Sequence, residues 1–104
     1  MSTAGPEEFR ETRPPAVAGS FYPVGPRELE SEVRRLLRAA PAPDPGSLGR
    51  PWGLIVPHAG YAYSGAVAAA GYRLLEGERI ETVVLLGPSH HLHFRGASVG
   101  RYSS

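Results

Sequence analysis

Two histidines follow two apolar segments of the chain, at the positions where a parallel β-sheet presents its ligands. Residues 54–56 are followed by Pro57 and His58, and residues 82–86 are followed four positions later by His90. If both segments are parallel strands, His58 and His90 lie at one edge of the sheet, outside the carboxyl ends of the strands. Neighbouring strands lie about 4.8 Å apart. The two imidazoles could therefore approach one metal ion, at about 2.0–2.2 Å each.

The residue types leave the identity of this metal open. Imidazole is a ligand of iron, zinc and copper. The alternative is that His58 and His90 are exposed loop residues whose ring nitrogens hydrogen-bond the backbone. A catalytic iron site of the two-histidine-one-carboxylate kind also needs an Asp or Glu at the same edge. The single aspartate, Asp44, lies in a Pro-rich linker, so we expect a third ligand to come from residues beyond Ser104, another chain or water.

Three further side chains near these histidines are candidates for proton transfer or substrate binding. Histidine is a common general acid or base, and His91 is a candidate for that role, whereas His93 fits a solvated loop equally well. Tyr61 and Ser64 lie in the loop that leads from the first strand into a helix, and the amino termini of helices bind anions through free N–H groups. We expect Tyr61 and Ser64 to border a pocket for a small anionic ligand. The alternative for Tyr61 is simple packing of the ring.

Two helices are predicted from composition and apolar spacing. Residues 26–39 begin with Pro26, which suits the first helical position. Three glutamates, at 28, 30 and 32, precede three arginines, at 34, 35 and 38, as the helix dipole favours. One apolar stripe runs along this helix. It consists of Leu29, Val33, Leu36 and Leu37. Residues 64–75 are rich in alanine and begin with Ser64, a residue type that often caps helices.

The two apolar segments predict a parallel sheet. Residues 54–56 and 82–86 are apolar on both faces, which is typical of buried parallel strands. The residues between them are enough for a right-handed crossover through a helix. The predicted fold class is therefore α/β, a βαβ unit of a mostly parallel sheet with flanking helices. So few strands leave edges and a face uncovered, so we expect the unit to be an incomplete part of a larger α/β domain.

At 104 residues the chain has room for one small domain. Residues 1–13 are polar without apolar periodicity and are predicted to be a disordered leader. Residues 14–104 would form the single domain portion, with residues 41–51 as a Pro/Gly linker within it. The chain has no cysteine, so it builds no disulfide or thiolate metal site by itself.

Composition also argues against several classes of partner. A net charge of +1 with interspersed signs provides no basic surface for nucleic acid. No segment approaches the roughly 20 apolar residues of a membrane span, and the amino terminus lacks the apolar region of a signal peptide. We therefore expect a cytoplasmic protein that binds neither nucleic acid nor membranes.

Three short motifs give the chain a resemblance to a known family. They are Ala-Gly-Ser-Phe-Tyr-Pro at residues 18–23, Pro-His-Ala-Gly-Tyr at 57–61 followed by Tyr-Ser-Gly at 63–65, and Gly-Pro-Ser-His-His at 87–91. In this order they resemble the MEMO family, whose prokaryotic members are called AmmeMemoRadiSam system protein B. The resemblance covers residues 13–104. Because family proteins are much longer, the chain looks like an amino-terminal fragment of one.

The resemblance implies a fold like that of the LigB-type, class III extradiol dioxygenases, which are nonheme iron enzymes. It implies that His58 and His90 are metal ligands, with a cysteine further along the family sequence as the usual third ligand. That cysteine has no counterpart in this chain. By position, His91, Tyr61 and Ser64 would border the pocket.

Two classes of function follow from the resemblance. The first is a nonheme iron (Fe2+) protein with redox or dioxygenase-like chemistry in the full-length protein, with a radical SAM protein and an AMMECR-type protein as partners in the same system. The second is a non-catalytic module of the same fold that binds an anion or a peptide. An inactive truncated product is a third alternative. Whether the chain is an enzyme is left open, because two histidines do not complete a catalytic metal site.

Overall fold

The computed structural model describes residues 12–44 and 49–100 of the chain. One compact unit is Ala16–Arg79, and a second unit contains the remaining described residues. The predicted leader, residues 1–13, lies outside the described residues except for its last two positions, and so does part of the predicted linker. No helix in the described parts of the chain is long and apolar enough to cross a membrane.

Helix α1, Pro26–Ala39, has the bounds that the sequence pattern predicts. Proline stands at its start, Glu28 lies in the first turn and Arg38 in the last, as the helix dipole favours. Glu32 accepts hydrogen bonds of 2.7 and 3.0 Å from the guanidinium of Arg35. The bond that Arg35 donates holds the pKa of the Glu32 carboxyl below its ordinary value.

Helix α2, Tyr61–Tyr72, is followed by the 3-10 turn η1, Arg73–Leu75. The end of this helical region agrees with the prediction, but its start does not. The helix begins three residues before Ser64, with Gly60 as its N-cap, so the prediction of Ser64 as N-cap is wrong. The physical reason is a contact with a distant segment: the N–H of Tyr61 donates a 2.8 Å hydrogen bond to the carbonyl oxygen of Phe21. This bond satisfies an amide that would otherwise need a cap nearby in sequence.

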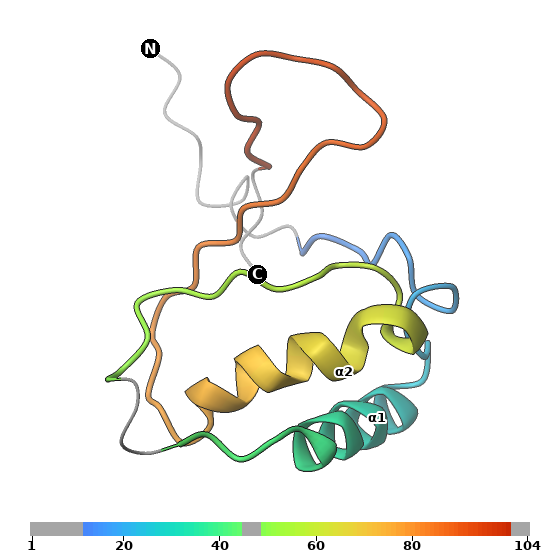
Figure 1. The fold of residues 1–104 in the computed structure, drawn as a ribbon. Helices are drawn as coiled ribbons and strands as arrows, with labels where there is room; N and C mark the ends of the chain where they lie inside the picture. Colours follow the sequence, from blue (N-terminus) through green and yellow to red (C-terminus); the bar gives the residue numbers. More distant parts are fainter. Residues whose placement is uncertain (1–11, 45–48, 101–104) are drawn as a thin grey trace. The chain divides into compact units, whose positions relative to one another are not determined.

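The two helices lie side by side and run in the same direction (Figure 1). Leu36 of α1 packs against Gly65 of α2, where an added Cβ atom would lie only 3.0 Å from the Leu36 side chain. At the other end of the contact, the Arg73 guanidinium donates hydrogen bonds to the carbonyl oxygens of Ala40 and Arg38. Arg73 therefore caps the carboxyl end of α1 from the end of α2.

Removing this cap is expected to destabilise the helix pair. In Arg73→Met the last carbonyls of α1 lose a charged donor that also complements the helix dipole, so we expect the free energy of unfolding to fall by about 1 kcal/mol. Urea unfolding followed by circular dichroism measures the change. Arg79→Met, at an exposed position after η1, is the control and should leave stability unchanged. Equal losses in both variants would contradict the capping role.

One face of the first predicted strand, residues 54–56, packs against α2. The side chains of Val56 and Leu54 approach Gly71 of α2: a Cβ atom there would lie 2.8 Å from Cγ1 of Val56 and 3.9 Å from Cδ1 of Leu54. Ile55, between them, is fully exposed. The segment therefore alternates in burial, as a strand does when helices cover only one of its faces.

The predicted parallel sheet is not formed by the described residues. Neither 54–56 nor 82–86 is a strand, and a single isolated β-bridge joins Ala18 and Tyr22. The side chains at positions 83–86 are 68% to 93% exposed. Strands need hydrogen-bonded neighbours and a covered face. Two segments alone provide too few hydrogen-bonding neighbours and too little cover for a stable sheet. The apolar pattern therefore overestimates how far these residues are buried.

Candidate metal and ligand site at the amino end of α2

A tight turn over residues 16–23 contacts the residues that follow His58. Gly19 adopts φ +87°, and its N–H donates a 2.7 Å hydrogen bond to the carbonyl oxygen of Tyr22. The carbonyl oxygen of Val17 accepts bonds from the N–H of Phe21 at 2.9 Å and from the hydroxyl of Ser20 at 3.1 Å. Local hydrogen bonds therefore define the shape of this turn.

This turn docks on the amino end of α2. Besides the hydrogen bond from Tyr61 to Phe21, the rings of Tyr22 and Tyr61 lie in contact, with centroids 5.6 Å apart and a tilt of 39°. Gly60 lies beside the same residue, where an added Cβ atom would make an ordinary contact of 3.5 Å with Cα of Phe21. The structure thus joins two motifs that are far apart in the sequence, at 18–23 and 57–61. Sequence reasoning missed Phe21 and Tyr22 as site residues; the only signal was the presence of their motif beside the histidine motif.

His58 lies in the loop that this contact holds, two residues before the N-cap Gly60, and it is exposed. Ser64 is buried, and its hydroxyl donates a 2.8 Å hydrogen bond to the carbonyl oxygen of Ala59. Tyr61 is half-buried against Tyr22. Ser64 and Tyr61 therefore hold the backbone that carries His58.

The amino end of α2 has fewer free N–H groups than an anion site would use. The N–H of Tyr61 is bonded to Phe21, and those of Tyr63 and Ser64 donate to the carbonyl oxygen of Gly60 at 2.9 and 3.0 Å. Anion binding at helix termini depends on amides that are not already paired. The contact that positions His58 thus weakens the case for an anion held by this helix end.

His90 and His91 lie in the second unit, both exposed, with ring centroids 6.5 Å apart and an edge-on arrangement. The hydroxyl of Ser89 donates to the carbonyl oxygen of Leu92 at 2.5 Å and accepts from the Leu92 N–H at 3.3 Å. These two hydrogen bonds close a short turn that contains His90 and His91. His93 follows it directly and is also exposed.

His58 and His90, the predicted metal ligands, lie in different units of the structure. Imidazoles at His58 and His90 are ligands that iron, zinc and copper accept. In the part of the chain that the structure describes, no three His, Cys, Asp or Glu side chains form a group that could hold an ion. The structure brings Tyr61 and Ser64 to the loop of His58, and His91 to the loop of His90. Among the described residues, neither of these two loops provides the third metal ligand that a catalytic site needs.

Comparison with known proteins identifies the class to which this fold and these motifs belong. Residues 13–104 match the family described as Memo-like protein. The chain belongs to this Memo-like family.

The chain is similar to several archaeal and bacterial relatives. A MEMO1 family protein of Methanopyrus kandleri is 45% identical over 85 residues, which cover 75% of this chain and 30% of the relative. One of Methanocaldococcus jannaschii is 43% identical over 100 residues, covering 88% and 34%. One of Thermotoga maritima is 44% identical over 88 residues, covering 75% and 31%. The chain therefore spans about a third of the length of these relatives. No solved structure matches it.

Proposed function

We propose that this chain supplies two metal ligands, His58 and His90, to a longer Memo-like protein, and that the metal is nonheme iron. The observation that carries the proposal is the docked turn at the amino end of α2. The hydrogen bond between Tyr61 and Phe21 and the contact of the Tyr22 ring tie the residues that follow His58 to the distant turn at 16–23. A metal ligand needs such support, because its imidazole must be aimed before the ion arrives.

A βαβ unit is part of this proposal. Helices α1 and α2 run in the same direction and residues 53–58 run in the opposite direction along α2 (Figure 1), as connected helices and strands do in parallel α/β folds. Val56 and Leu54 face α2. We infer that residues 54–56 and 82–86 pair as parallel strands when further strands of a LigB-like α/β domain complete the sheet. Residues 14–104 would then be the amino-terminal portion of that domain.

In the longer protein each residue has a definite task. The imidazoles of His58 and His90 donate lone pairs to the metal, and a third ligand comes from outside these residues. Bound iron would supply redox or dioxygenase-like chemistry. His91, next to a ligand, would hold or transfer a proton, and Tyr61 and Ser64 would border the pocket of a small anionic substrate. A radical SAM protein and an AMMECR-type protein are the proposed partners.

The alternative function, a non-catalytic module for anions or peptides, has less support. Its strongest form places the anion at the amino end of α2. Two of the first three N–H groups of this helix, those of Tyr61 and Tyr63, already donate to carbonyl oxygens. We therefore favour the metal.

The proposal predicts that His58 and His90 respond to a metal together. Zn2+ is the diamagnetic probe, and the imidazole C–H signals of His58, His90, His91 and His93 are followed by NMR during its titration into the longer protein that contains these residues. We expect the signals of His58 and His90 to shift at the same metal concentration, with the affinity reduced about 10- to 100-fold in His58→Ala and in His90→Ala, because one imidazole alone binds weakly. Metal analysis after loading with Fe2+ under anaerobic conditions tests whether iron binds at the same site.

The matched control is His93→Ala, which removes an exposed imidazole three residues from His90 and should leave the titration unchanged. If His58 and His90 respond independently, or if all four histidines shift in parallel, the shared site does not exist in this chain. Preference for zinc or copper over Fe2+ would keep the site but replace the proposed metal.

A further inference from the structure

The hydroxyl of Ser64 reaches back from α2 to the residue that directly follows His58. It donates a hydrogen bond of 2.8 Å to the carbonyl oxygen of Ala59 and a weaker one of 3.5 Å to that of Gly60. Ser64 is only 8% exposed, whereas His58 and Ala59 are exposed. A partly buried hydrogen bond therefore links the helix to the loop of the predicted metal ligand.

The helix itself does not need this hydroxyl. Its N-cap, Gly60, has no side chain, and no side chain caps the helix start in the usual way. The N–H groups of Tyr63 and Ser64 already donate to the Gly60 carbonyl oxygen, and alanine would suit a position inside the helix better than serine does. The contribution of the Ser64 hydroxyl is therefore to the loop before the helix.

We propose that Ser64 is a positioning residue for the metal ligand His58. Its hydroxyl fixes the carbonyl group of Ala59, and thereby the course of the backbone on the carboxyl side of His58. The proton of the hydroxyl is already given to Ala59, so Ser64 has none to donate to a bound anion even where it borders the pocket. Partners outside the ligand shell commonly orient metal ligands in this way.

This inference rests on the proposed function, because it concerns a ligand of the proposed metal site. It does not rest on the parts of the longer protein that lie outside the chain. The hydrogen bond joins residues five positions apart within the unit Ala16–Arg79. Ser64 is already buried by residues of this chain.

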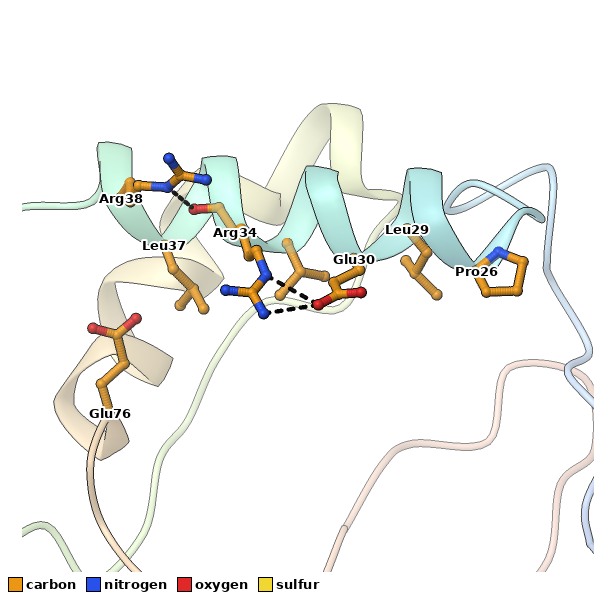
Figure 2. Close-up of a pocket in the computed structure, with 8 residues that line it drawn as sticks. Pro26, Leu29, Glu30, Arg34, Leu37, Arg38 and Glu76 are labelled. Carbon is orange, nitrogen blue, oxygen red and sulfur yellow. Dashed lines mark hydrogen bonds and ion pairs between the residues drawn. The ribbon is translucent and has the colours of Figure 1, made fainter.

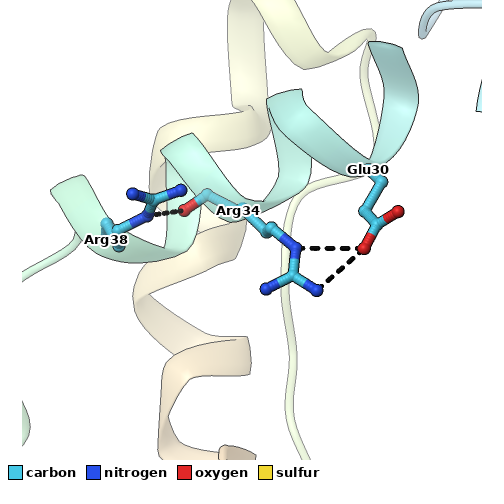
Figure 3. Close-up of polar contacts among 3 residues, drawn as sticks. All are labelled: Glu30, Arg34 and Arg38. Carbon is cyan, nitrogen blue, oxygen red and sulfur yellow. Dashed lines mark hydrogen bonds and ion pairs between the residues drawn. The ribbon is translucent and has the colours of Figure 1, made fainter. Parts of the chain in front are cut away.

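The polar contacts of α1 differ from this bond in both burial and place. Glu30 and Arg34 pair at 2.8 Å with side-chain exposures of 63% and 65%, and Arg38 donates to the carbonyl oxygen of Arg34 (Figure 3). These three residues help to line a groove on α1 (Figure 2). Exposed pairs of this kind contribute little to stability. Glu30→Gln is therefore a control that removes an ion pair without changing the loop of His58.

The affinity for Zn2+ tests the proposal, measured by competition with a chromophoric chelator in the longer protein that contains these residues. We expect Ser64→Ala to lower the affinity about tenfold. Ser64→Thr keeps a hydroxyl that can bond a carbonyl oxygen in the preceding turn, so its affinity should stay within about threefold of the parent value. Ser20→Ala removes a comparable bond of 3.1 Å, to the carbonyl oxygen of Val17, and should change nothing, as should Glu30→Gln.

A second measurement does not need the metal. In the metal-free protein, 15N relaxation reports the order of the His58 and Ala59 amides, and Ser64→Ala should lower the order parameters of both, whereas Ser64→Thr and Ser20→Ala should not. A purely structural role would lower the urea midpoint of Ser64→Ala but leave Zn2+ affinity and loop order as in the parent protein.

Either unchanged affinity or unchanged order in Ser64→Ala would overturn the positioning role. If the parent protein itself binds no Zn2+ through His58 and His90, the proposed function fails. The order parameters then decide by themselves whether Ser64 fixes the backbone at His58.

Discussion

Gly71→Val is expected to lower the free energy of unfolding by about 2 kcal/mol, because it overpacks the contact between α2 and residues 54–56. A Cβ atom at this position would lie 2.8 Å from Cγ1 of Val56. Valine at 56 is stiff about χ1 and cannot swing its methyl group away without leaving a preferred rotamer. The helix or the segment must therefore shift. Thermal and urea unfolding followed by far-UV circular dichroism measure the loss.

Two variants separate this contact from helix propensity. Ala70→Val adds the same side chain type to α2 at an exposed neighbouring position, so it should cost only the few tenths of a kcal/mol that valine costs in a helix. The double variant Gly71→Val/Val56→Ala removes the obstructing methyl groups and should recover part of the loss. If Gly71→Val is no worse than Ala70→Val, residues 54–56 do not pack on α2 as the structure has them.

Gly19→Ala is expected to destabilise the turn that holds the loop of His58, by about 2 kcal/mol. Gly19 has φ +87°, a conformation that residues with a Cβ atom rarely adopt, and the added atom would lie 3.0 Å from Cγ2 of Val24. Undocking of the turn would release the N–H of Tyr61 from Phe21. We therefore expect faster hydrogen exchange at the Tyr61 amide, measured by NMR, together with a lower urea midpoint.

Two other glycines are matched controls for this change. Gly77 also has a positive φ, of +78°, but a Cβ atom there would meet nothing within 4 Å. Gly77→Ala should therefore show the backbone strain alone and leave the Tyr61 amide protected. Gly53→Ala, in open space without a positive φ, should be neutral. Unchanged exchange at Tyr61 in Gly19→Ala would mean that the turn does not depend on Gly19.

The docked turn links these stability effects to the proposed site. In the structure residues 16–23 contact Gly60 and Tyr61, which follow His58 closely in the chain. Gly19→Ala should therefore also weaken the response of both His58 and His90 to Zn2+, because the two imidazoles would share one ion.

Predictability from the sequence differed between the elements according to how local their determinants are. Helix α1 has its predicted bounds because proline at the start, ordered charges and one apolar stripe all act within the helix. Helix α2 begins earlier than predicted because its first amide is bonded to Phe21, forty residues away. No local pattern signals such a bond. The family resemblance is confirmed over residues 13–104, since motifs depend on residue identity and order alone.

The sequence by itself determined the family, helix α1 and the candidate metal ligands, His58 and His90, with their neighbours. Only the tertiary structure decided that the turn at 16–23 packs against the amino end of α2, and that residues 54–56 bury one face while Ile55 is exposed. The physical reason is the range of the interactions. Capping, charge order and apolar spacing operate over a few residues, whereas docking of a turn or pairing of strands depends on backbone groups that meet only when distant segments fold together.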